Sequence, residues 1–358
     1  MTDTRPWPDT APRFEVNNLS VADFKNGVLV RSPNWLGDAV MTLPALMQLR
    51  KIIPKSCALA VVCPENLEEF FLSLPIIDQV ITYERGQRFW NKKMRNKIRW
   101  VHFGLAVMFN NSLRDALLLK SLGIPKLYGA AARGRSFLLK RSFKFPKIKP
   151  GQLHGLQHVD RYLSIVKALG APDWNGELPE FKLGNTPEYC PDGRLLALAP
   201  GAAYGAAKRW PSESFRTIAA LWLEQGGHVL VLGSSSENRI AGEVLDGLSS
   251  KKTLNLCGKT NMSELMALLK CVDGVVANDS GLMHLSAALG VPGVAIYGPT
   301  DWTSTSPISN SWRILFERQS CAPCFKRECP VGTAHCMTAI TPTQVWDALQ
   351  QTIKENCQ

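Results

Sequence analysis

The stretch VANDSGLMHLSAALGVPGVAIYGPTD, residues 276–301, predicts a buried strand, a polar turn, a helix that carries His284, and a second buried strand. The turn contains Asn278, Asp279, Ser280 and Gly281. Backbone N–H groups at the start of such a helix point outward without a partner, and the helix dipole favours an anion there. The stretch therefore predicts a phosphate-binding unit. A plain helix cap at Asp279 and a half-buried structural histidine would give the same pattern.

Short β-rich runs alternate with helical patterns along the rest of the chain. The expected strands are 27–31, 58–63, 79–82, 104–109 and 126–128 in the first half, and 195–200 and 228–233 in the second. The expected helices are 157–169, 212–225, 237–248, 261–270 and 343–355, and the aperiodic segment 170–193 reads as a linker. This alternation is typical of parallel sheets with crossover helices. We therefore expect an α/β fold of two doubly wound domains, 25–180 and 190–358, with a ligand-binding cleft between them.

Composition agrees with two domains, because 358 residues of which 45% are hydrophobic suffice for two cores. The first residues, MTDTRPWPDTAPRF, contain no apolar run, and no segment approaches the ~20 apolar residues of a membrane span. We expect a cytoplasmic protein. The chain has no G-x-G pair, no P-loop lysine motif and no Asp-x-Asp motif. These absences argue against a dinucleotide-binding fingerprint, a P-loop nucleotidase and a metal-dependent sugar transferase of the single-domain type.

The net charge of +11 is concentrated in one segment, residues 86–149, which contains 16 Lys and Arg residues but only one acid, Asp115. Nucleic acid, an anionic membrane and a phosphorylated substrate would each suit such a segment, and a solvated basic surface is the plain alternative. The run RFWNKKMRNKIRW, residues 88–100, interleaves cations with apolar and aromatic residues at helical spacing. This pattern favours a membrane-surface contact.

Four of the ten cysteines cluster in CAPCFKRECPVGTAHC, at positions Cys321, Cys324, Cys329 and Cys336. The first pair has the spacing of zinc ligands, but the later separations match no common zinc ribbon. A structural metal and a packed or redox-sensitive thiol loop both remain open, and the spacing favours the thiol loop.

Two further stretches place functional side chains after expected strands. In VRSPNWLGDAVMTLPAL, residues 30–46, Asp38 lies at the start of a helix, where a carboxylate also stabilises the helix dipole. In LAPGAAYGAAKRWPSESF, residues 198–215, small residues allow a close approach of backbone to an oxyanion, and Lys208 adds a mobile cation. A flexible loop with surface cations is the plain alternative for the second stretch.

The segments PNWLGD, PGAAYG, AKRWP and DSGLMH, together with the trailing cysteine loop, resemble the bacterial lipopolysaccharide heptosyltransferase family over nearly the whole chain. DSGLMH is typical of the whole family, whereas AKRWP is typical of its type II members. One difference is visible, because the family commonly has a proline where this chain has Ala206 or Ala207.

The resemblance implies the GT-B architecture of two facing Rossmann-like domains and inversion at the anomeric carbon, with no obligatory metal or other cofactor. It implies that Asp38 is the catalytic carboxylate and that Lys208 contacts the donor phosphates. Glu237 resembles the acid that binds the adenosine ribose, although the sequence SSSE allows a shift of register. The residues matched to donor diphosphate and heptose contacts are Asp279, Ser280, Gly281 and His284.

The function implied is transfer of L-glycero-D-manno-heptose from ADP-heptose to the first heptose of the inner core, with lipid A–Kdo2–heptose as acceptor. The C-terminal domain would bind the donor and the N-terminal domain the acceptor. We expect a monomer at the cytoplasmic face of a Gram-negative inner membrane that binds no nucleic acid. Acceptor and anionic membrane contacts are expected at Lys92, Lys93, Arg95 and Lys97. The alternatives are a related transferase acting on another core position or sugar, and a non-catalytic nucleic-acid-binding protein.

Overall fold

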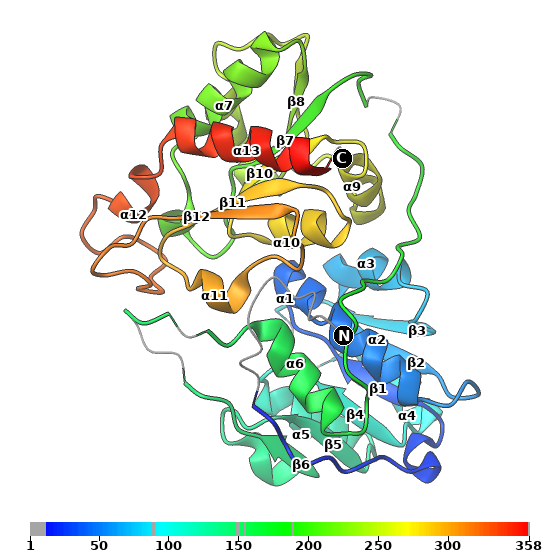
Figure 1. Cartoon of the computed structure of the whole chain (residues 1–358). Coiled ribbons are helices and arrows are strands. Elements are labelled where there is room, and N and C mark those ends of the chain that lie inside the picture. Colours follow the sequence, from blue (N-terminus) through cyan, green and yellow to red (C-terminus); the bar gives the residue numbers. More distant parts are fainter. Residues whose placement is uncertain (1–11, 87–89, 148–150, 154, 188–189, 357–358) are drawn as a thin grey trace. The chain divides into compact units, whose positions relative to one another are not determined.

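The computed structural model describes residues 12–86, 90–147, 151–153, 155–187 and 190–356, and it divides the chain into two compact units (Figure 1). The first unit contains the chain up to Lys147 and the segment Leu156–Lys182. The second contains the chain from Leu183 onward and a short segment that ends at Gly155.

The first unit is built on a six-stranded parallel sheet with the order β3-β2-β1-β4-β5-β6. Its strands are β1 (Val28–Arg31), β2 (Leu59–Pro64), β3 (Gln79–Tyr83), β4 (Leu105–Met108), β5 (Lys126–Ala130) and β6 (Arg141–Phe143). This is the Rossmann strand order, in which ligands bind where the order reverses, here beyond the carboxyl ends of β1 and β4.

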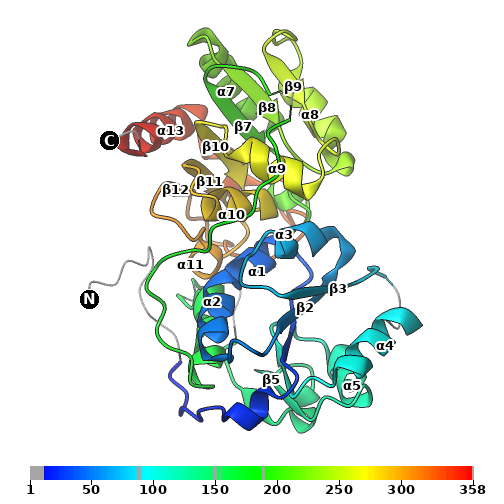
Figure 2. The ribbon, with the colours of Figure 1, turned by 90° about the vertical axis from the view of Figure 1, so that its right-hand side faces the viewer.

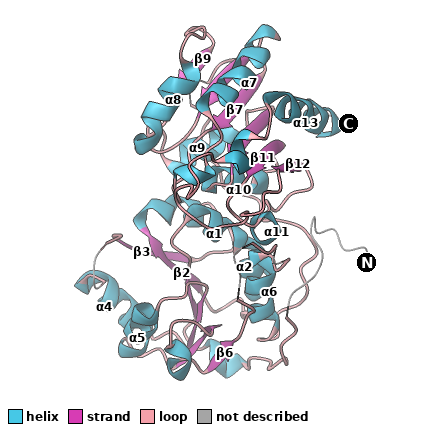
Figure 3. Ribbon diagram, turned by 90° about the vertical axis from the view of Figure 1, so that its left-hand side faces the viewer, coloured by secondary structure: helices cyan, strands magenta, loops and turns pink. Residues whose placement is uncertain are grey.

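Helices cover both faces of this sheet (Figure 3). They are α1 (Leu36–Met41), α2 (Leu43–Ile52), α3 (Glu68–Leu72), α4 (Lys92–Val101), α5 (Leu113–Ser121) and α6 (His158–Lys167). One face packs on α4 and α5 through alternate strand residues such as Leu29 and Ala106, which meet Met94, Ile98 and Leu119. Because the central strands are buried on both faces, they are almost continuously apolar, and this explains why the sequence predicted them.

The second unit has a parallel sheet with the order β12-β11-β10-β7-β8-β9. Its strands are β7 (Leu195–Ala199), β8 (His228–Val231), β9 (Thr253–Asn255), β10 (Gly274–Asn278), β11 (Gly293–Tyr297) and β12 (Trp312–Phe316). Counted along the chain, this is the strand order of the first unit again. The order reverses between β7 and β10, the two strands that precede the predicted phosphate-binding segments.

The helices of the second unit are α7 (Ser212–Glu224), α8 (Asn238–Leu245), α9 (Met262–Leu269), α10 (Gly281–Ala288), α11 (Trp302–Thr305), α12 (His335–Thr338) and α13 (Pro342–Asn356). Figure 2 shows α7 and α8 beside β7, β8 and β9. One apolar core joins the sheet to α7, α8 and α13, with Phe215, Trp222 and Leu349 fully buried in it. None of the helices in the described part of the chain is long and apolar enough to cross a membrane.

The predicted α/β doubly wound fold is confirmed. The strands β6, β9 and β12 were not predicted. Each is an edge strand whose pairing depends on one neighbour, and β6 and β9 are only three residues long. Two boundaries also differ from expectation. Asn278 ends strand β10 instead of beginning the turn, and Glu237 lies in a 3-10 turn before α8 instead of in the helix.

Candidate active site

In the second unit, one buried amide joins the segments that follow β7 and β10. Asn278 is fully buried at the end of β10. Its Oδ1 accepts the backbone N–H of Trp210 at 3.0 Å, and its Nδ2 donates to the carbonyl oxygen of Pro200 at 2.8 Å. Pro200 and Trp210 bracket the small-residue loop that carries Lys208. The loop after β7 is therefore fixed at both ends by a side chain from the neighbouring strand, a role that the sequence did not reveal.

Lys208 and Asp279 form a buried ion pair, in which Nζ lies 2.5 Å from Oδ2. Thr300, which follows β11, donates a second hydrogen bond to the same oxygen at 2.7 Å. Burial alone would raise the pKa of Asp279, but the charges of Lys208 and His284 and these hydrogen bonds hold it below its usual range. The expectation of a mobile Lys208 is wrong in one respect, since only 9% of the residue is exposed.

Helix α10 begins directly after Asp279, with Ser280 as its N-cap. The Ser280 side chain accepts the N–H of Met283 at 3.4 Å. The N–H groups of the first helical turn, starting at Gly281, have no acceptor inside the helix and are suited to an anion. His284 lies one turn along and is buried, with 3% of its surface exposed. The structure thus brings Lys208 together with the predicted segment of residues 279–284.

Glu237 approaches the other end of the β7 loop. Its Oε2 accepts hydrogen bonds from the backbone N–H of Ser234 at 2.7 Å and from the Ser234 hydroxyl at 2.9 Å. A Cβ atom at position 201 would lie 1.7 Å from Oε1 of Glu237, so a larger residue there would push the Glu237 carboxylate aside. Glu237 and Gly201 are therefore neighbours at the carboxyl edge of the sheet, which places the predicted ribose-binding acid beside the predicted phosphate loop.

In the first unit, Asp38 lies in the first turn of α1, close to the start of α6. Nδ1 of His158 is 3.7 Å from Oδ1 of Asp38, and both side chains are partly exposed. Tyr162 lies one turn along α6. Its burial, and to a smaller extent the charge of Asp38, raise the pKa of its hydroxyl well above the usual value. The sequence did not predict His158 as a site residue, because nothing local to it indicates its contact with α1.

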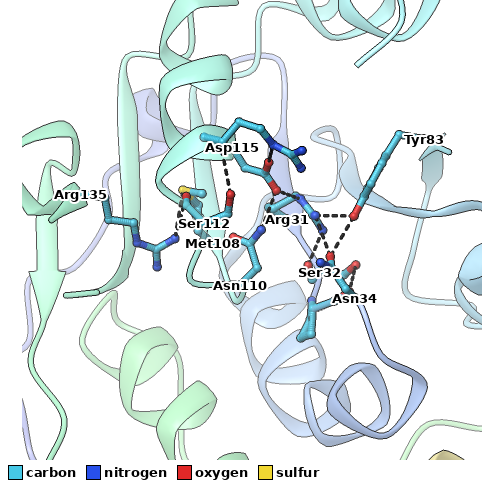
Figure 4. Close-up of polar contacts among 11 residues, drawn as sticks. Arg31, Ser32, Asn34, Tyr83, Met108, Asn110, Ser112, Asp115 and Arg135 are labelled. Atoms are coloured by element: carbon cyan, nitrogen blue, oxygen red, sulfur yellow. Dashed lines mark hydrogen bonds and ion pairs between the residues drawn. The ribbon is translucent and has the colours of Figure 1, made fainter. Parts of the chain in front are cut away.

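A buried polar network fixes the loop that leads to Asp38 (Figure 4). Arg31, at the end of β1, is fully buried, and its Nε donates to Oδ2 of Asp115 at 2.7 Å. Asn110, after β4, donates to the same carboxylate oxygen at 2.7 Å. Burial raises the pKa of Asp115, but the guanidinium groups of Arg31 and Arg114 outweigh it and hold the pKa below the usual range.

The other end of the Arg31 guanidinium holds the 32–35 loop. Its Nη1 donates to the carbonyl oxygen of Ser32 at 2.5 Å, and its Nη2 donates to Oδ1 of Asn34 at 2.8 Å. The hydroxyl of Tyr83, at the end of β3, accepts from Nη2 of Arg31 and donates to Oδ1 of Asn34 at 2.8 Å. Because α1 starts immediately after this loop, the network positions the helix that carries Asp38.

The predicted acceptor cations Lys92, Lys93, Arg95 and Lys97 all lie on α4. Met94 and Ile98, on the opposite side of this helix, are buried in the core. The lysines therefore project outward. Trp100 follows them and is 86% exposed. Two other cations of the basic segment have partners or positions inside the protein, since Arg135 is fully buried and Lys126 pairs with Asp23.

The described residues contain no group of three or more His, Cys, Asp or Glu side chains arranged to hold a metal ion. Four cysteines do line a single cavity in the second unit, and their cavity adjoins the β7 loop at Ala207.

Residues 91–335 match the sequence model of glycosyltransferase family 9 (heptosyltransferase). This chain belongs to family 9. The match spans more than half of the chain and includes the Lys208 loop and the α10 segment, so the non-catalytic nucleic-acid-binding alternative is set aside.

Among family 9 relatives, lipopolysaccharide heptosyltransferase 2 of Salmonella typhimurium is 26% identical over 352 residues, which are 92% of this chain and 99% of the relative. Lipooligosaccharide heptosyltransferase 2 of Campylobacter jejuni is 29% identical over 341 residues, with the same coverage of 92% and 99%. The solved structure of E. coli ADP-heptose LPS heptosyltransferase II superposes with a TM-score of 0.75 at 25% identity, covering 92% of this chain and 99% of the other.

Proposed function

We propose that this family 9 glycosyltransferase transfers a heptose from ADP-heptose to the first heptose of the lipopolysaccharide inner core. The observation that carries the proposal is the ion pair of Lys208 and Asp279 at the N-terminus of α10. The pair places a cation beside the start of α10 at the switch point of the second unit, where a nucleotide diphosphate is expected. Likeness to type 2 heptosyltransferases over nearly the whole chain supports the same donor and acceptor.

In the proposed reaction, the acceptor hydroxyl attacks the anomeric carbon of the donor heptose from the face opposite ADP. Asp38 accepts the hydroxyl proton as the new carbon–oxygen bond forms, and ADP leaves with the electrons of the bond that breaks. His158, 3.7 Å from Asp38, orients the carboxylate. Asp38 belongs to the first unit, and the proposed donor site belongs to the second.

Negative charge develops on the departing diphosphate, and the second unit is equipped to stabilise it. Lys208 is held by Asp279, and the Thr300 hydroxyl donates to the same Asp279 oxygen, before any donor is present, so the ammonium needs little rearrangement. The N–H groups at the start of α10 add a positive potential. Preorganised donors of this kind stabilise charge that builds up in the transition state. This arrangement performs the part that a metal ion has in other sugar transferases, and we propose that no metal is obligatory.

Glu237 is proposed to accept hydrogen bonds from the ribose hydroxyls of ADP. Its carboxylate lies against Gly201, at the start of the loop that is proposed to hold the phosphates. The segments after β8 and β7 are neighbours at one edge of the sheet. A nucleoside bound at Glu237 would therefore lie next to the proposed phosphate site. Along this edge the segments after β8, β7 and β10 come in that order, and they are proposed to contact the ribose, the diphosphate and the heptose in turn.

Helix α4 is proposed to contact the acceptor and the anionic inner leaflet of the membrane. Its lysines project outward next to an exposed Trp100, and no acidic side chain among the described residues forms an ion pair with them. Cations beside an exposed indole are typical of surfaces that rest on anionic lipid headgroups.

The test is incubation of the purified protein with ADP-heptose and a set of truncated lipopolysaccharide cores, followed by mass spectrometry and linkage analysis of the product. We expect one heptose to be added to the core that already carries one heptose, and none to the core that ends at Kdo. Transfer to the Kdo-terminated core would assign the other core position. No transfer to any core would refute the proposal.

A further inference from the structure

The cysteine loop of the second unit forms a shared thiol environment. Cys321, Cys324, Cys329 and Cys336 line one cavity together with His335 and Ala207. All four are free thiols. The proposed sugar transfer uses none of them, so their convergence on one cavity needs another explanation.

The four thiols are chemically unequal. The Sγ atom of Cys329 accepts the backbone N–H of Ala334 at 3.3 Å. This hydrogen bond and those from Val331, Gly332 and Thr333 hold the pKa of Cys329 below its usual value. Burial and the neighbouring sulfur atoms instead raise the pKa of Cys336 to about 11. Since the thiolate is the reactive form of cysteine, the cavity combines one activated sulfur with thiols that stay protonated.

The same loop supports the segment that carries Lys208. The carbonyl oxygen of Arg327 accepts the N–H of Ala207 at 3.0 Å, and that of Phe325 accepts the hydroxyl of Tyr204 at 2.7 Å. A Cβ atom at Gly205 would lie 2.4 Å from the Arg327 carbonyl oxygen, so the two segments are in direct backbone contact. The cysteine loop therefore contacts the residue that precedes Lys208 directly.

We propose that Cys329 is a site of reversible oxidation that weakens donor binding by displacing the Lys208 loop. A hydroperoxide oxidises the Cys329 thiolate to a sulfenic acid and is itself reduced to the alcohol or water. The thiol of Cys321, Cys324 or Cys336 then attacks this sulfur, a disulfide forms, and water leaves. A dithiol reductant restores both thiols. The effect on donor binding rests on the proposed function, whereas the thiol chemistry does not.

The chemistry is tested on the reduced wild-type protein by timed iodoacetamide labelling at pH 7 and peptide mass spectrometry. Cys271 is the internal control, because it is exposed but lies outside the loop. We expect Cys329 to be alkylated at least several-fold faster than Cys271, and a slight excess of hydrogen peroxide to give a disulfide that contains Cys329. Equal rates, or thiols protected by stoichiometric bound zinc or iron, would overturn the proposal.

Coupling to the donor site is tested by ADP calorimetry before and after peroxide treatment. We expect oxidation to weaken ADP binding about tenfold or more and dithiothreitol to restore it. Cys329→Ser should bind ADP like the reduced wild type and resist peroxide, whereas Cys271→Ser should remain sensitive. ADP binding that is unchanged despite a complete disulfide would overturn the inference alone. Failure of the reduced protein to bind ADP would instead count against the proposed function.

Discussion

The Nζ atom of Lys208 lies 2.5 Å from Oδ2 of Asp279, although the two residues come from loops after different strands, β7 and β10. Only 11% of the lysine side chain and 7% of the aspartate side chain are exposed. A buried pair of this kind holds the ammonium in one place, and removal of either partner leaves an uncompensated charge. The position of Lys208 is therefore fixed by the fold before the donor binds.

Lys208→Met should weaken ADP binding about 10–100-fold, because a hydrogen bond to a charged group contributes about 1.5–3 kcal/mol. Turnover should fall as well, since the same cation is proposed to stabilise the leaving diphosphate. Calorimetry with ADP measures the first effect and single-turnover kinetics the second. Lys251→Met, an exposed lysine of the same unit, is the matched control. Unchanged ADP affinity in Lys208→Met would contradict the assignment.

Asp38→Asn should slow transfer by at least ~100-fold and leave the affinity for ADP-heptose nearly unchanged, because the amide keeps the shape but cannot accept the proton. His158→Gln should cause a smaller loss, since it removes only the group beside the carboxylate. Product formation and donor binding are measured on the same preparations. An Asp38→Asn variant with near wild-type turnover would show that Asp38 is only a residue of the helix start.

Activity should persist after exhaustive treatment with EDTA, because Lys208 and the start of α10 are proposed to stabilise the diphosphate. The measurement is initial rates before and after chelation, with added magnesium as the comparison. A complete loss of activity that magnesium restores would refute the metal-free mechanism, while Lys208 would keep its assignment to the donor.

Arg31→Met should destabilise the first unit by about 3–5 kcal/mol, because it leaves Asp115 buried without its main cationic partner. Asp173→Asn, which breaks the exposed pair with Lys167, should cost no more than about 1 kcal/mol. Hydrogen exchange of the β1 and β4 amides under native conditions reports the free energy of opening in both variants. Equal effects of the two substitutions would mean that the network is not the main support of the loop before Asp38.

Replacing Lys92, Lys93, Arg95 and Lys97 by glutamine should weaken binding to anionic vesicles, at ~1 kcal/mol per cation near the surface. ADP affinity should not change, because the proposed donor site belongs to the second unit. The control removes four exposed lysines of the second unit, namely Lys251, Lys259, Lys326 and Lys354. If both quadruple variants lose the same vesicle affinity, net charge and not helix α4 determines binding.

The sequence predicted the central strands well because their burial on both faces demands apolar runs, as in Leu195–Ala199. It also located the α10 turn, where Asp279, Ser280 and Gly281 act through local backbone geometry. These features depend on residues that are adjacent along the chain, so their signals are visible in a short window.

Contacts between distant segments were not predictable in the same way. His158 reaches Asp38 only because α6 packs beside α1, and no pattern around His158 reports that packing. The sequence predicts Asn278 to be a turn residue. In the structure its buried side-chain amide forms hydrogen bonds with the backbone of Pro200 and Trp210. In each case the decisive partner lies far along the chain, and a single sequence gives no measure of that pairing.

The amide of Asn278 also has a thermodynamic consequence for the loop between Pro200 and Trp210. Restricting the backbone of a residue costs roughly 1–2 kcal/mol in conformational entropy. In the folded protein the Asn278 side chain restrains both ends of this loop, and the Arg327 carbonyl oxygen restrains its middle. Little of that entropy remains to be lost when ADP-heptose arrives. The glycine- and alanine-rich composition, which would suit a flexible tether, is thus found on an already ordered backbone, and its small side chains would leave room for the phosphate oxygens of the proposed donor.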